Sequence, residues 1–307
     1  MPRVDSDYLG RLSSDKTIYR YMDFAKFVNL LQTEELHFHQ AADFEDRFEG
    51  SVPEIIEQAR KREYEQAEAE GRMGPDGHQI HAEINKCLRR FTYLNCWHMK
   101  EDESVAMWEK YGGSDRAVAI KTTVEDFTVA LNRDPDHDIY FERVEYRPYS
   151  SDHEATPDID EIDLDEMDPR FFLTREAHSL VPFVYKRKGF EYEEEMRAII
   201  QEPPVDPELN STIIVTDGEE RRVGYQIDTE QEPQYLDTRK ENPNKGLNIP
   251  IYLDALIDTV HFAPDAPGWF KSTVENVLGN CEVLMEESEV DDIIQDSIMD
   301  HDREPVF

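Results

Sequence analysis

The sequence predicts an α+β fold, in which mixed, mostly antiparallel sheets and flanking helices form a single large domain. The chain has 307 residues, of which 38% are hydrophobic, and this is enough for one substantial core. Short alternating apolar segments typical of strands are interspersed with amphipathic segments typical of helices. Their order lacks the regular strand–helix–strand repeat of a doubly wound sheet, which favours α+β.

The first half of the chain contains most of the predicted helices. A strand at residues 18–22 leads to Asp23, whose side chain can accept a hydrogen bond from the first turn of a helix that extends through Leu31. The other predicted strands are at residues 35–39, 91–98, 117–121 and 139–146, and the other helices are at 53–70, 78–90, 102–111 and 124–131. Asp102 is the expected cap of the helix at 102–111.

The second half is dominated by strands and two acidic segments. A helical region at residues 169–184 precedes a strand in the stretch 185–200; further strands are predicted at 211–215, 248–252, 257–264 and 281–285, and a helix at 267–278. Residues 150–168 are rich in Pro and Asp and are interpreted as a polar acidic insertion. The domain is expected to span residues 1–287 and to end in an acidic, flexible tail at 288–307.

The charge of the chain is strongly negative throughout its length. It has 69 acidic and 33 basic residues and a net charge of −36, which favours a halophilic, archaeal protein with a hydrated carboxylate surface. An ordinary acidic protein with disordered acidic insertions is the alternative. Such a surface repels phosphates, so bulk nucleic-acid binding is not expected, although a local basic pocket is compatible with it.

Several compositional features predict a cytoplasmic protein without a membrane partner. No run approaches the ~18 apolar residues of a membrane span, and the N-terminal residues lack the apolar core of a signal peptide. The three cysteines, Cys87, Cys96 and Cys281, are odd in number and have no metal-type spacing, which is typical of reduced thiols.

The most unusual polar stretch is residues 185–200. Three consecutive basic residues, 186–188, precede Glu193, Glu195 and Arg197, which a strand would place on one face because its side chains alternate. Two carboxylates and a guanidinium on one face form either a structural ion-pair ladder or a polar site.

Six short motifs together resemble a known prokaryotic family. In order, they are Tyr19-Arg20-Tyr21, residues 44–50, Cys96-Trp97-His98, Met107-Trp108 with Tyr111, Tyr192-Glu193 with Glu195 and Arg197, and Ala263-Pro264. The set resembles the domain-of-unknown-function family 2971 over residues 17–287. The chain departs from the family pattern at Glu45-Asp46-Arg47, where the family has Asn-Asp-Pro, and at His98, where it has Ser.

A second similarity, to the Arg–Ser–Glu plan of ADP-ribosyltransferases, implies an NAD-cleaving site. In that plan Arg20 supports the NAD phosphates, Cys96 occupies the bracing strand, and Glu195 holds the nicotinamide ribose while Glu193 orients the acceptor. The expected catalytic residues are therefore Glu195 and Glu193, and the expected NAD-binding residues are Arg20, Tyr21, Cys96, Trp108, Tyr111 and Arg197. NAD would be a substrate and the acceptor is unassigned. A toxin or antiviral effector would use such chemistry.

The residue types suit this chemistry. A carboxylate stabilises the oxocarbenium-like state of glycosidic cleavage, a guanidinium binds pyrophosphate, and aromatic rings such as those of Trp108 and Tyr111 stack on nicotinamide or adenine.

Two other functions fit the sequence. A non-catalytic binding or interaction module would use the same polar residues as scaffold. A nuclease or phosphoesterase would hold Mg²⁺ with Glu45, Asp46 and Glu49, since carboxylates suit that ion, but these acids lack partner histidines. His37 and His39 have no partner pair at zinc-site spacing, so no metal site is predicted.

Overall fold

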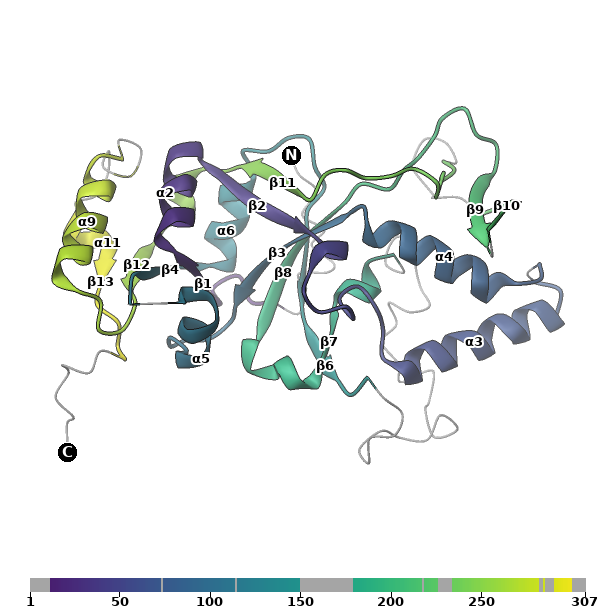
Figure 1. Cartoon of the computed structure of the whole chain (residues 1–307), viewed down its shortest axis with the longest axis horizontal. Helices are drawn as coiled ribbons and strands as arrows, with labels where there is room; N and C mark the ends of the chain where they lie inside the picture. Colours follow the sequence, from purple (N-terminus) through teal and green to yellow (C-terminus); the bar gives the residue numbers. More distant parts are fainter. Residues whose placement is uncertain are drawn as a thin grey trace.

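The computed structural model describes residues 12–72, 74–113, 115–149, 179–216, 218–225, 234–281, 284 and 290–299. It confirms the α+β fold: a mixed sheet runs through the middle of the molecule, with helices packed against it and a helical hairpin extending from one end (Figure 1). The predicted insertion at 150–168 lies outside the described residues.

The central sheet has β3 at its branch point. One path runs β11 (Gly246–Pro250), β2 (Glu35–Gln40), β3 (Thr92–His98), β1 (Thr17–Asp23), β4 (Ala117–Thr123), β12 (Thr259–Phe262) and β13 (Ile294–Gln295). On its other edge β3 pairs with β8 (Glu195–Gln201), and β8 pairs with β5 (Tyr140–Arg143). Among the described strands of this sheet only β12 and β13 are parallel, so the expected antiparallel character is confirmed.

The sheet divides along one edge of β3. There β3 pairs with β2 at Leu94 and with β1 at His98, which leaves a gap beside Asn95. The Asn95 side chain fills this gap: its Nδ2 donates to the carbonyl of His37 at 2.9 Å, and its Oδ1 accepts from Arg20 at 2.7 Å. Asn95 is buried, so these bonds replace the ladder hydrogen bonds that the gap removes.

Helices α2 (Phe24–Thr33), α6 (Val124–Leu131), α8 (Leu253–Leu256) and α9 (Gly268–Gly279) contribute to the main core with one face of the sheet. Asp23 caps α2 as predicted, and its carboxylate accepts from the Lys26 N–H. Ile18, Trp97 and Met196 supply strand side chains to this core.

The opposite face of the sheet is covered in two parts. The short helix α5 (Val105–Met107) and the π-helix η2 (Trp108–Gly112) pack on β1 and β4. The 3₁₀ helices η1 (Ala41–Asp43) and η5 (Val181–Phe183), the strand β7 (Tyr185–Arg187) and the start of α3 (Glu54–Ala69) pack on β3 and β8.

The helical hairpin at the end of the molecule carries a small sheet. Helix α4 (Gly77–Arg89) follows α3, and its Ile84 and Leu88 pack against Ile214 of β9 (Thr212–Thr216). β9 forms an antiparallel hairpin with β10 (Glu219–Val223) (Figure 1).

Three predicted elements are broken in the structure. The strand expected at 139–146 is β5 followed by β6 (Glu145–Arg147), which pairs in parallel with β7. The stretch 185–200 comprises β7, the 3₁₀ helix η6 (Lys188–Glu193) and β8, so Glu193 precedes the strand instead of lying in it. The helix expected at 102–111 is α5 plus η2, and Ser104, not Asp102, precedes its first turn.

The C-terminal prediction also needs correction. Residues 290–299 lie against the domain, because α11 (Val290–Ile293) is followed by β13, which pairs with β12. The Ser297 hydroxyl then donates to the buried Glu103 carboxylate at 2.6 Å. The strand expected at 281–285 is not seen in its described residues, since Leu284 is helical.

Among the described residues, no helix combines the length and the apolar composition needed to cross a membrane.

Candidate functional site

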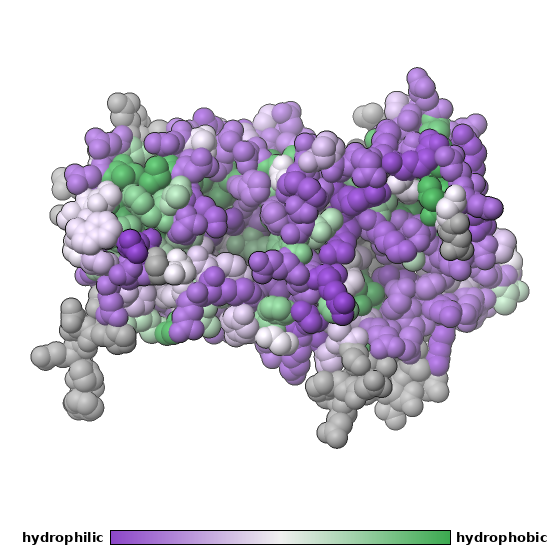
Figure 2. Space-filling model, viewed as in Figure 1, coloured by the Kyte–Doolittle hydropathy of each residue, from purple (hydrophilic) through white to green (hydrophobic). Residues whose placement is uncertain are grey.

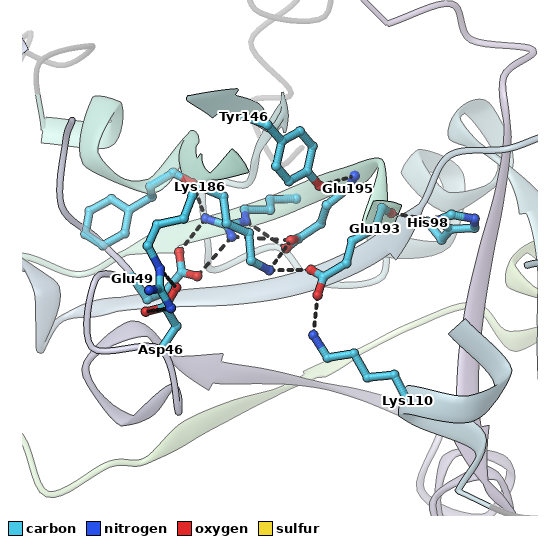
Figure 3. A network of polar contacts seen from close by, with 11 residues as sticks. Asp46, Glu49, His98, Lys110, Tyr146, Lys186, Glu193 and Glu195 are labelled. Carbon is cyan, nitrogen blue, oxygen red and sulfur yellow. Dashed lines mark hydrogen bonds and ion pairs between the residues drawn. The ribbon is translucent and has the colours of Figure 1, made fainter. Parts of the chain in front are cut away.

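Six side chains of alternating charge form a buried ion network on the second face of the sheet (Figure 3). In order of contact they are Glu49, Arg197, Glu195, Lys186, Glu193 and Lys110. Three carboxylates face three cations, so the formal charge of the network is zero. All of these side chains except Lys110 are buried. The Lys110 side chain is 34% exposed, so the network reaches the surface there.

Arg197 is the centre of this network and is fully buried. Its Nε donates to Glu195 Oε1 at 2.8 Å, and its two terminal nitrogens donate to Glu49 at 2.6 and 3.1 Å. They also donate to the Phe183 carbonyl at 2.5 Å and to Glu195 Oε2 at 3.4 Å. These bonds use all five donors of a guanidinium.

Lys186 joins the two carboxylates that flank residue 194. Its Nζ donates to Glu195 Oε2 at 2.7 Å and to Glu193 Oε2 at 2.5 Å. Burial alone would raise the pKa of Glu195, but the charges of Arg197 and Lys186 hold it well below its usual range. Burial alone would lower the pKa of Lys186, yet the facing carboxylates raise it. Both groups therefore stay ionised at neutral pH.

The backbone at Glu194 brings the two carboxylates together. Its left-handed conformation, φ 36°, ends η6 and begins β8. The carbonyl of Glu194 accepts from the Met99 N–H at 2.8 Å, and the carbonyl of Glu193 accepts from His98 Nδ1 at 2.5 Å. This turn lets Glu193 outside the strand and Glu195 inside it reach the same ammonium.

Four of the predicted site residues lie in or beside the network. Glu193, Glu195 and Arg197 belong to it, and the Cys96 thiol lies beside the Glu195 carboxylate and helps to lower its pKa. Burial raises the pKa of Cys96 well above its usual value, so the thiol is protonated. Tyr111, the fifth, lies at the exposed edge, and burial of its hydroxyl together with Glu193 raises its pKa to about 12.

Arg20 lies on the other side of the sheet. Its guanidinium bonds to Asn95 and lies 5.8 Å from the centre of the Trp97 ring, which belongs to the main core. Strand alternation places Asn95 and Cys96 on opposite faces, and Cys96 is the register partner of Arg197. Arg20 also donates to the Cys96 carbonyl at 3.2 Å, but its side chain and that of Glu195 extend from opposite faces of the sheet.

Tyr21 and Trp108 belong to a separate aromatic cluster. Their rings meet edge to face, with centroids 4.8 Å apart. Trp108 Nε1 donates to the buried Glu103 at 2.8 Å, and the Tyr21 hydroxyl accepts from the Ser104 N–H at 2.9 Å. Glu103 also bonds to His261 Nδ1 at 3.0 Å, so this cluster has its own polar centre.

The acidic side chains predicted to hold Mg²⁺ do not converge on one point, because two of them pair with different arginines. Glu49 pairs with Arg197, and Asp46 pairs with Arg187 at 3.0 Å, while Glu45 is exposed. Across the part of the chain that the structure describes, no group of His, Cys, Asp and Glu could hold a metal ion.

Sequence reasoning missed the roles of Lys186, Lys110, Glu49 and Asn95. The basic run at 186–188 marked the position of Lys186, but a single charge in a run does not identify its partner. Lys110 and Glu49 are 83 and 148 residues from their partners along the chain, and no local pattern predicts such pairs.

Comparison with curated proteins and with solved structures gave no match. Residues 107–198, which include the Met107-Trp108 and Glu193–Arg197 motifs, match the model of the family described as a protein of unknown function, DUF2971, and this confirms the predicted resemblance over that stretch.

Proposed function

We propose that the protein is a non-catalytic binding module in which the buried ion network is a scaffold. The supporting observation is that Arg197 uses all five donors within the protein and that both oxygens of Glu195 accept from internal cations. A group whose bonds are all satisfied internally has no capacity left for a ligand unless the network breaks.

The charge balance supports the same proposal. Stabilisation of an oxocarbenium-like state needs an anionic carboxylate that faces the sugar. Glu195 is anionic, but two cations already compensate its charge and it is buried. Its depressed pKa also makes it unsuited to general acid or base catalysis near neutral pH.

NAD cleavage is the second candidate, and one observation favours it. Five of the residues assigned to the NAD site, Glu193, Glu195, Cys96, Arg197 and Tyr111, lie in or beside the network. In this candidate the protein would be an ADP-ribosyltransferase-like defence effector, and the network would have to open on NAD binding.

Incubation of the purified protein with NAD in molar salt separates the two candidates. We expect no nicotinamide release above the rate without protein. Release that is lost in Glu195→Gln but kept in Glu191→Gln, an exposed glutamate of η6, would overturn the proposal. Circular dichroism of both variants would show that the loss is not unfolding.

A further inference from the structure

A continuous row of cations and aromatic rings lies on the surface above the ion network. We call it the cation–aromatic row; its members are Arg47, Phe48, Arg187, Phe190, Lys110, Tyr111 and Tyr192. The Arg187 guanidinium lies between two rings, 4.9 Å from that of Phe48 and 5.3 Å from that of Phe190. Lys110 Nζ is 5.0, 5.1 and 5.8 Å from the rings of Phe190, Tyr111 and Tyr192.

The row comes from three segments that the ion network holds together. Arg47 and Phe48 lie in the loop that Glu49 anchors to Arg197. Arg187 and Phe190 lie in β7 and η6, next to Lys186 and Glu193, and Lys110 and Tyr111 lie in η2. Figure 3 shows Lys110 reaching Glu193 from one side and Asp46 lying near Glu49 on the other. The spacing of the row is thus a property of the folded scaffold.

The row is accessible at both its rings and its cations. Tyr111 and Tyr192 are 42% and 41% exposed, and the Arg187 side chain is 40% exposed. Tyr111 and Tyr192 differ from the other exposed rings because both adjoin one ammonium, that of Lys110, on a surface with a net charge of −36. Lys110 lies over one part of the Tyr111 and Tyr192 rings, and the exposed part of each ring leaves area on which a ligand can stack.

We propose that the cation–aromatic row binds nucleotides with unpaired bases, an inference that rests on the proposed role as a binding module. Successive bases stack on aromatic side chains, and the cations between the rings pair with the phosphates. This arrangement tolerates any base because every base has a π-face. A duplex is not a ligand of this row, because its bases are already stacked and its charge density is higher.

The electrostatics of the row explain how a strongly acidic protein can bind such a ligand. Arg187 is paired with Asp46 and Lys110 with Glu193, so the row adds little net positive charge. Stacking therefore supplies most of the affinity, and high salt screens the repulsion between phosphates and the distant carboxylates. Three phosphate contacts alone would make affinity fall about a hundredfold for each tenfold rise in salt. We expect a much smaller fall here.

Fluorescence anisotropy tests the proposal with a labelled thymidine oligonucleotide, labelled AMP and a labelled DNA duplex, each in about 0.2 M and about 2 M KCl. Stacking energies measured on other proteins imply a loss of about tenfold or more per ring. We expect that loss in Tyr111→Ala and in Tyr192→Ala, and retention of binding in Tyr111→Phe, which keeps the ring. The matched control is Tyr252→Ala, because Tyr252 is 48% exposed and lies outside the row.

Each outcome decides the proposal. Oligonucleotide or AMP binding that needs Tyr111 and Tyr192 but not Tyr252 supports it. The ligand that binds more tightly shows whether the row binds a single strand or a free nucleotide. Absence of binding, binding that is unchanged in both ring variants, or stronger binding of the duplex overturns it. If binding is absent and no nicotinamide is released from NAD, the inference fails while the proposed function stands; nicotinamide release that depends on Glu195 refutes the function itself.

Discussion

At the scale of the residue, the ionised side chains of the buried network are stable only beside an opposite charge. Arg197 is fully buried and Glu195 nearly so, and each is tolerable only because the other is present. A buried ion pair of this kind adds little stability relative to apolar residues, but removal of one partner leaves an uncompensated charge. Removal of the Glu195 charge therefore has two measurable effects.

The first concerns stability at neutral pH. We expect Glu195→Gln to lower the free energy of unfolding by about 3–5 kcal/mol, because Arg197 and Lys186 would lose their shared anion. Glu191→Gln is the matched control at an exposed position of η6 and should change the value by less than about 0.5 kcal/mol. Urea unfolding of the three proteins measures both values. Equal stability of the two variants would show that the network contributes nothing to the fold.

The second concerns pH. The pKa of Glu195 is lower in the folded protein than in the unfolded chain, where it is about 4.3. Its ionised form therefore stabilises the fold above that value, and this stabilisation is lost as the pH falls below it towards the folded pKa. We expect the stability gap between the wild type and Glu195→Gln to narrow between about pH 4.5 and pH 3. A gap that stays constant in urea titrations across this range would contradict the assignment.

At the scale of the element, the loop before α3 depends on a glycine. Gly50 has φ +72°, and a Cβ at this position would lie 2.8 Å from Cε1 of Phe183. Phe183 in turn supplies the carbonyl that Arg197 donates to, and Glu49 precedes the glycine. The conformation of this turn therefore sets the position of one end of the ion network.

Substitution of this glycine separates backbone strain from steric overlap. Gly71 has a similar φ of +69° but nothing within 4 Å of its Cβ position, so Gly71→Ala reports strain alone, about 1–2 kcal/mol. We expect Gly50→Ala to destabilise the protein by more than Gly71→Ala, because it adds the overlap with Phe183. Thermal unfolding of both variants measures the difference. A loss in Gly50→Ala that is no larger would mean that the Phe183 ring moves without cost.

At the scale of the whole molecule, charge repulsion opposes folding. Figure 2 shows a face covered mainly by hydrophilic side chains, and the chain carries 69 acidic residues against 33 basic ones. The network and the surface ion pairs neutralise only part of this charge. Salt screens the remainder, since the Debye length falls from about 10 Å at 0.1 M to about 3 Å at 1 M.

We accordingly expect the melting temperature to rise between about 0.1 M and about 2 M KCl, in keeping with the halophilic character predicted from composition. Differential scanning calorimetry at both concentrations measures the change. A melting temperature that falls with salt would indicate that surface ion pairs, which salt weakens, outweigh the repulsion.

Local features of this protein follow from its sequence alone. The cap at Asp23 depends on a hydrogen bond to a residue three positions away. The strand β1 and the helix α6 follow from the spacing of apolar residues along the chain. The irregular order of helices and strands was enough for the α+β class, and the motifs at Met107 and Glu193 were enough for the family resemblance. The unusual stretch at 185–200 was also visible, because its basic run stands out in an acidic chain.

The contacts of that stretch depend on the tertiary structure. The left-handed turn at Glu194 lets Glu193 and Glu195 both accept from Lys186. Arg197 donates to Glu49, which lies in a loop 148 residues earlier in the chain. Strand alternation puts the Arg20 side chain on the face of Trp97 and the Glu195 side chain on the opposite face. Such pairings depend on which strands become neighbours and which face each side chain takes, and distant contacts of this kind leave no periodic signal in the sequence.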